Sequence, residues 1–300
     1  MIRTADDLLT SIKNGASIPA NQIRFSDTML LGFADEFTRG TIVPELIRLK
    51  SEILTVRETV TVTGSQRYLI PARAVGRTLR AVFWDGESLR PLDYLQWRDE
   101  SGDPLMVGFE GNYFLPYPTP ASTSTGKLEI AYYCKPSALV KTSSAGKITS
   151  INSGSNLIQV ASVPSSIVTG VSVDLIRGQG GNDILLRDAV ATVSGTNITL
   201  STALPTDLAL NDYVCLAGYS PVVNMPEELA SLLSKAVQIV VLEAQSDMEA
   251  LQLAQASYKK LAENAYSATS PRMQGESDRL NPSPFLNRSA IWRRNLWRQP

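Results

Sequence analysis

The chain has no histidine among its 300 residues, and this absence excludes several kinds of chemistry. Histidine is the usual proton-transfer group near neutral pH and the commonest protein ligand of transition metals. Ser-His-Asp and Cys-His catalytic groups and histidine-bound zinc sites are therefore excluded. We expect no enzymatic activity, no cofactor and no bound metal ion.

Cysteine is also scarce. The two cysteines, Cys134 and Cys215, lie in apolar strand-like runs, where a small buried side chain is the ordinary expectation. A disulfide framework is not indicated, and neither is secretion.

Net charge and long apolar runs are the remaining absences. The 28 Lys and Arg residues nearly cancel the 29 Asp and Glu residues, and the net charge of −1 gives no overall attraction to nucleic acid or to an anionic membrane. No apolar run approaches the roughly 18 residues of a spanning helix, and charges arrive too early for a signal peptide. We expect a protein that is made in the cytoplasm and has no membrane partner.

Helical patterns occupy residues 1–54. Thr4 and Ser26 each precede a run of apolar residues at helical spacing, in the position of an N-cap. A further helix is expected after Gly40, with Pro44 in its first turn, where the missing N–H costs little.

A second helical segment covers residues 224–269. Asn224 is the expected N-cap of a long helix, because Pro226 falls in the first turn and the following glutamate can reach back as in a capping box. Helical spacing continues beyond a bend near residues 245–247. This segment exceeds an average helix in length, so we expect it to form one bundle with residues 1–54.

The apolar pattern changes to a period of two at residue 55. Residues 55–63 are β-branched and alternating, and residues 128–133 are another strand candidate. Asp85-Gly86 is a turn of the kind favoured in tight hairpins. We expect a β-rich segment over residues 55–139.

A turn-rich stretch covers residues 140–222. Small polar segments separate short apolar runs, a pattern typical of a small sandwich or barrel-like insertion. The loop that Gly178 opens lacks the spacing of a phosphate-binding motif, so a hairpin turn is expected. The nearby acids lack a calcium-loop pattern and fit turn chemistry. The apolar runs are residues 157–160, 171–176, 184–186, 198–200 and 213–216. The predicted fold class is α+β, a helical bundle with a β segment, this insertion and an extended C-terminal arm.

The arm, residues 270–300, combines prolines with many arginines and large apolar side chains. Trp and Arg supply much of the energy of protein interfaces, so we expect docking on a neighbouring subunit or another protein. A helix folded back on its own chain is one alternative, and nucleic-acid binding through Arg and stacked Trp is another. The candidate portal- or partner-binding residues are Arg272, Arg279, Phe285, Leu286, Arg288, Ile291, Trp292, Arg293, Arg294, Trp297 and Arg298.

Three stretches carry a resemblance to a known family. Residues 25–54 hold an apolar helical face and Ile42-Val43-Pro44-Glu45-Leu46, and residues 204–225 end in Gly218-Tyr219-Ser220-Pro221 before a helix start. Ser270-Pro271-Arg272 opens the arm. With the order of elements, these stretches resemble the head-to-tail adaptor proteins of tailed bacteriophages, which include the tail tubular protein A group.

The resemblance implies a structural protein in the neck or tail of a virion. Such subunits form a homo-oligomeric ring, expected here to be a dodecamer, that docks under the portal protein and meets the next tail or nozzle protein. Their C-terminal arms grip the portal, and double-stranded DNA only passes through the lumen. Two alternatives stay open. One is a distal tail or baseplate component that contacts a receptor, and the other is a virion-associated carbohydrate hydrolase that pairs acids between Asp85 and Asp103.

Overall fold

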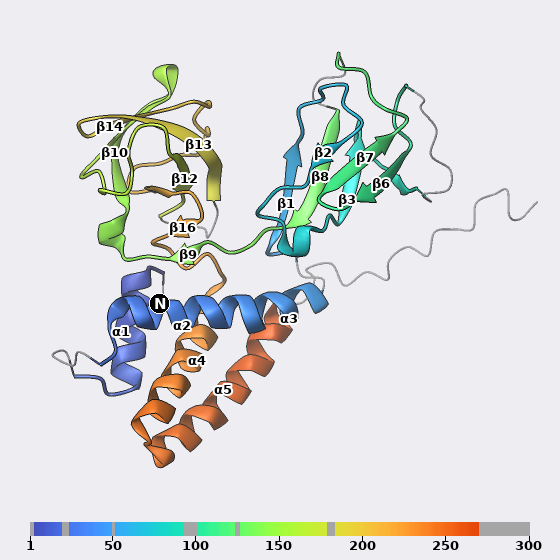
Figure 1. The fold of residues 1–300 in the computed structure, drawn as a ribbon. Coiled ribbons are helices and arrows are strands. Elements are labelled where there is room, and N and C mark those ends of the chain that lie inside the picture. The colour runs from blue at the N-terminus through green and yellow to red at the C-terminus, as the bar shows by residue number, and fades with distance from the viewer. Residues whose placement is uncertain are drawn as a thin grey trace, which may run out of the picture.

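The computed structural model describes residues 3–19, 24–49, 52–92, 101–123, 127–178 and 184–269. Helices lie at one end of the molecule, and two β units stand side by side on them (Figure 1). We call these parts the helical layer (residues 4–49 and 224–269), the sheet unit (residues 55–133) and the barrel (residues 146–216).

Both N-caps expected in residues 1–54 are confirmed. Thr4 accepts the N–H of Asp7 at 3.1 Å, and the Asp7 carboxylate accepts the N–H of Thr4 at 3.0 Å. Ser26 accepts the N–H of Met29 at 3.2 Å. The α-helices are α1 (Ala5–Gly15), α2 (Asp27–Phe37), α3 (Val43–Arg48), α4 (Glu227–Gln245) and α5 (Met248–Ala268). Within the described residues, none of them is apolar over enough length to cross a bilayer.

The chain does not leave the helix at Gly40. Helix α2 continues through a π-helical segment, Thr38–Ile42, into α3, so the separate helix expected there is joined to α2. Pro44 accounts for the wide turn. It has no N–H to donate to the Gly40 carbonyl, and its ring would collide with that carbonyl in a regular helix.

The start of α4 differs from the expectation. Pro226 occupies the N-cap position without a side-chain hydrogen bond, so the predicted Asn224 cap is wrong. The predicted bend is confirmed. Ser246 has a left-handed φ of 61°, and Asp247 caps α5 by accepting the N–H of Ala250 at 3.1 Å.

The helical bundle expected as the framework of the fold is also wrong. The helices do share one hydrophobic cluster, but α2 runs across the α4–α5 hairpin and not along it (Figure 1). Most of the described body is sheet, because residues 55–220 form strands that enclose hydrophobic cores of their own. The fold is mixed α and β, and the helices are one part of it.

The strands of the sheet unit are β1 (Thr55–Thr59), β2 (Tyr68–Leu69), β3 (Ala81–Trp84), β4 (Glu87–Ser88), β5 (Arg90–Pro91), β6 (Met106–Glu110), β7 (Tyr113–Tyr117) and β8 (Leu128–Tyr133). They form sheets of order β1-β8-β3-β4 and β2-β7-β6-β5. Val82, Phe114 and Tyr132 are buried in their shared core. The predicted Asp85-Gly86 turn is confirmed, since both residues have positive φ and join β3 to β4.

The turn-rich stretch forms a closed barrel of order β10-β11-β14-β13-β12-β15. Its strands are β10 (Gly146–Asn152), β11 (Leu157–Val160), β12 (Ser172–Ile176), β13 (Ile184–Ser194), β14 (Asn197–Leu200) and β15 (Tyr213–Leu216). Every apolar run predicted in this stretch lies on one of these strands, whereas β10 was not predicted. The hairpin expected after Gly178 falls mostly outside the described residues.

Polar contacts connect the segments that flank the barrel to the helical layer. Below the barrel, the carboxylate of Asp35 on α2 accepts the N–H of Leu139 at 3.0 Å. Asp27, at the start of α2, pairs with Lys13 of α1 and with Lys141 of the segment that enters the barrel. The hydrogen bonds from these two lysines lower the pKa of Asp27. The flanking strands β9 (Ala138–Leu139) and β16 (Tyr219–Ser220) pair in parallel at this level.

Candidate functional site at the junction of the two β units

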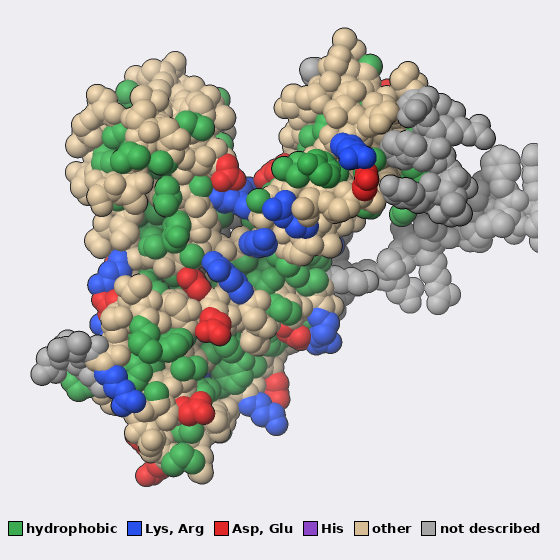
Figure 2. Space-filling model, viewed as in Figure 1, with side chains coloured by type: hydrophobic (Ala, Val, Ile, Leu, Met, Phe, Trp, Pro, Cys, Tyr) green, Lys and Arg blue, Asp and Glu red, His purple; other side chains and the backbone are tan. Residues whose placement is uncertain are grey.

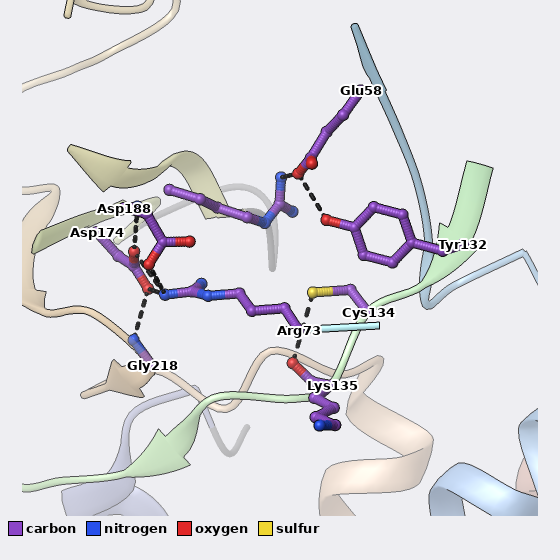
Figure 3. A network of polar contacts seen from close by, with 9 residues as sticks. Glu58, Arg73, Tyr132, Cys134, Lys135, Asp174, Asp188 and Gly218 are labelled. Atoms are coloured by element: carbon purple, nitrogen blue, oxygen red, sulfur yellow. Dashed lines mark hydrogen bonds and ion pairs between the residues drawn. The ribbon is translucent and has the colours of Figure 1, made fainter. Parts of the chain in front are cut away.

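A buried ion pair joins the sheet unit to the barrel. Arg73, from the segment after β2, donates from Nη2 to the two carboxylate oxygens of Asp174 at 2.9 and 2.8 Å and to Asp188 at 3.0 Å. Asp174 lies on β12 and is fully buried. The backbone N–H groups of Asp188 and Gly218 also donate to it, each at 3.0 Å. Figure 3 shows these groups converging on the Asp174 carboxylate.

Burial and the neighbouring charges shift the pKa of Arg73 in opposite directions. Burial disfavours the charged guanidinium, but Asp174 and Asp188 outweigh that effect and raise the pKa of Arg73. Removing one partner of such a pair leaves a buried charge without compensation, at a cost of about 3–5 kcal/mol. The pair therefore opposes separation of the two β units.

A β-bulge aims the groups of this junction. The register of β12 and β13 shifts around Asp174, so that Arg187 and Asp188 together lie opposite it. Asp188 lies in this bulge with a left-handed φ of 54°, and its N–H donates to the Asp174 carboxylate. Local strain in the barrel is thus linked to the contact with the sheet unit.

A second polar group lies between β1, β8 and β13. The Tyr132 hydroxyl donates to Oε1 of Glu58 at 2.7 Å (Figure 3). Nη1 of Arg187 lies 4.0 Å from the same oxygen. Burial, and then Glu58, raise the pKa of Tyr132 far above its usual range, so its hydroxyl stays protonated and donates. Burial also raises the pKa of the nearby Cys134 thiol, which makes a reactive thiolate unfavourable there.

A cleft of about 410 Å³ opens beside this junction. Figure 2 shows Lys and Arg side chains gathered where the two β units meet above the helices. The cleft is lined by Ile53, Leu54, Thr55, Val56, Cys134, Lys135, Pro136, Ser137, Arg177, Ile184, Leu185, Arg187, Asp207 and Asn224. All three parts of the molecule therefore contribute to its wall.

Several polar atoms in the cleft wall are buried without a hydrogen-bond partner in the protein. They are Nε of Arg187, Oγ of Ser137 and both amide atoms of Asn224. Buried polar groups in native proteins nearly always find a partner, and an unpaired one costs about 1–3 kcal/mol. The residues of the cleft wall therefore hold polar atoms that the chain buries without satisfying them.

The residues of this junction were not among the sites predicted from the sequence. The arm residues from Arg272 to Arg298 are outside the described residues, and so are the acids at 99 and 100. Asp85, Glu87 and Asp103 line one hollow of about 720 Å³ at the far edge of the sheet unit. Across the described ranges, no cluster of Cys, Asp and Glu is arranged to hold a metal ion.

Sequence reasoning missed the junction. One signal was available, because Asp174 interrupts the apolar run of residues 171–176, and a buried strand rarely carries a charge without a partner. The partner itself was not identifiable, since Arg73 lies 101 positions away.

Comparison with known proteins agrees with part of the resemblance. The family model described as SU10 adaptor protein matches residues 3–171, which is more than half of the chain and includes α1 to α3 and the whole sheet unit. No curated protein matches the chain. The match supports a structural adaptor of a bacteriophage, while the narrower likeness to the tail tubular protein A group stays a prediction. The chain belongs to the SU10 adaptor protein family.

Proposed function

We propose that this protein is a subunit of a head-to-tail adaptor ring that docks under the portal and joins the DNA-filled capsid to the tail. The observation that carries this proposal is the family match over the N-terminal helices and the sheet unit. The next tail or nozzle protein binds the opposite side of the ring, and double-stranded DNA passes through the lumen.

The junction between the β units suits this role. A ring subunit transmits force between the capsid and the tail, so its parts must keep their relative positions. The contacts of Arg73 with the buried Asp174 and with the more exposed Asp188 supply such a connection between the sheet unit and the barrel. Asp27 and Asp35 connect the barrel to the helical layer.

The nearly balanced charge of the chain is consistent with a channel through which DNA passes. Lys and Arg contacts to phosphate create affinity for any DNA sequence, and a channel through which DNA slides must avoid strong binding. The chain carries 28 cationic and 29 anionic residues, and this balance supports passage of DNA over retention.

The C-terminal arm is the proposed portal contact. Ordering an arm costs about 1–2 kcal/mol per residue in backbone entropy, which the Trp and Arg anchors of residues 272–298 must offset. Ring symmetry helps, because each arm is held at high effective concentration beside its own binding site on the portal.

Mixing the purified chain with isolated portal rings tests the proposal. The full chain is expected to stack a second ring on the portal, seen by size-exclusion chromatography and negative-stain microscopy. A chain ending at residue 270 should fold and fail to stack. The matched variant Trp292→Ala/Trp297→Ala should bind more weakly than a control, Asp278→Asn, on the same arm. Absence of any association would point to a distal tail component, and unchanged binding after truncation would refute the role of the arm.

A further inference from the structure

The first sheet of the sheet unit has two open edges. Its order, β1-β8-β3-β4, leaves β1 and β4 without a second neighbour. The N–H of Val60 donates to the carbonyl of Leu128. In an antiparallel pair, alternate residues point their backbone N–H and C=O groups toward the partner strand, so those of Arg57 and Thr59 point away from β8. No backbone hydrogen bond reaches Arg57 or Thr59 on that side from any other described residue. Open edges of this kind are templates for pairing with another chain.

The two edges carry opposite charge. The cleft beside β1 is lined by three cations and one anion, which are Lys135, Arg177, Arg187 and Asp207. The hollow beside β4 is lined by three carboxylates and one cation, which are Asp85, Glu87, Asp103 and Arg90. One edge of a subunit is therefore complementary in charge to the other edge of an identical subunit.

We propose that the β3–β4 hairpin of one copy, with Asp85 and Glu87 at its turn, enters the cleft beside β1 of the next copy. This contact rests on the ring proposed above and names the surfaces that neighbouring subunits share. A contact between two different surfaces of the same chain is heterologous, and its repetition about an axis closes a ring.

The cleft offers an accessible cation to the hairpin. Lys135 lies in the cleft wall and its side chain is exposed. Asp85 has an exposed side chain, at 72% of its full area, and Lys127 of its own chain lies 3.9 Å away, so the carboxylate has room for a second cation in the strong charge-assisted geometry. Entry of the hairpin pairs the exposed carboxylates of one copy with the exposed Lys135 of the next.

Disulfide trapping tests the contact. Cys134 lines the cleft, so all variants carry Cys134→Ala. In such a chain with Glu87→Cys and Asn224→Cys, mild oxidation on portal rings is expected to give a ladder of dimers, trimers and higher species on a non-reducing gel. A ladder requires each copy to be linked to two neighbours, and each single variant should give none. Glu87→Cys with Lys135→Cys, at an exposed cleft position, serves as a second pair if Asn224→Cys disturbs folding. Glu249→Cys on α5 with Asn224→Cys is the matched control, and it should give no ladder.

The same samples are scored for portal stacking by microscopy. Stacked rings without a ladder from either pair would overturn this contact and leave the adaptor function standing. A ladder without stacking would support the contact and count against docking on the portal. Absence of both would overturn both proposals.

Discussion

A single guanidinium nitrogen of Arg73 lies 2.9 and 2.8 Å from the two carboxylate oxygens of Asp174, although the residues are 101 positions apart. The Asp174 side chain is fully buried, and that of Arg73 keeps 15% of its area exposed. This pair connects the two β units, and the structure indicates what its loss should do.

Arg73→Met should lower the free energy of unfolding by about 3–5 kcal/mol, because a buried carboxylate loses its cation. Urea denaturation followed by circular dichroism measures the change. Adding Asp174→Asn to Arg73→Met should recover part of the loss, since the buried charge is then removed as well. Arg48→Met, which breaks an exposed pair with Glu45 on α3, is the control and should cause no resolvable change. Equal effects at positions 73 and 48 would contradict the role of burial.

Alanine substitution should change the free energy of unfolding by different amounts at Thr4 and at Asn224. Thr4→Ala removes the capping box of α1 and should cost about 1 kcal/mol. Asn224→Ala should cost less, because Asn224 caps no helix and its amide has no partner within the chain. Chemical denaturation of the two variants in parallel checks this order. A larger loss from Asn224→Ala would show that Asn224 stabilises α4 after all.

The contacts of Asp27 make stability depend on pH in the acid range. Lys13 and Lys141 hold the pKa of Asp27 below its ordinary value, so the unfolded chain takes up this proton first as pH falls. The contribution is present above about pH 4 and is lost as pH falls through the lower folded value. Asp27→Asn should cost at most about 1 kcal/mol at pH 7, since these side chains are partly exposed. The difference between wild type and variant should shrink below about pH 4 in a series of urea titrations. A constant difference would contradict the assignment.

The predicted domain division can be tested on the barrel. Its core residues, among them Ile158, Val173 and Val214, are buried against one another, so we expect residues 140–222 to fold alone. Circular dichroism should show β structure and cooperative thermal unfolding. Asp174→Asn should matter less in this fragment than in the whole chain, because Arg73 is absent from it. A fragment without cooperative unfolding would place the barrel in one folding unit with its neighbours.

Local features of the fold were predictable from neighbouring residues. Thr4, Ser26 and Asp247 form caps or bends with groups three positions away, and Asp85-Gly86 turns a hairpin over two residues. Backbone hydrogen bonding at this range depends on side chains close in sequence, so spacing alone identifies it. The strands of the barrel other than β10 were predictable from short apolar runs, which are also local in the sequence.

The predictions that failed concern features that depend on residues far apart in the sequence. Asn224 has the sequence context of a cap, but Pro226 takes that position and the Asn224 amide lines the cleft. The expected bundle failed because residues 55–220 bury most of their apolar side chains within the sheet unit and the barrel, and only a few, such as Leu139, against the helices.

The sequence by itself determined the local elements, the absence of histidine chemistry and the resemblance to phage adaptors. Only the tertiary structure decided that the barrel closes, that Arg73 reaches Asp174, and that a cationic cleft and a carboxylate hairpin lie at opposite edges of one sheet. The physical reason is the range of the interactions. Helix caps and hairpin turns form between residues a few positions apart, whereas buried charge pairs and sheet order depend on which distant segments exclude water together.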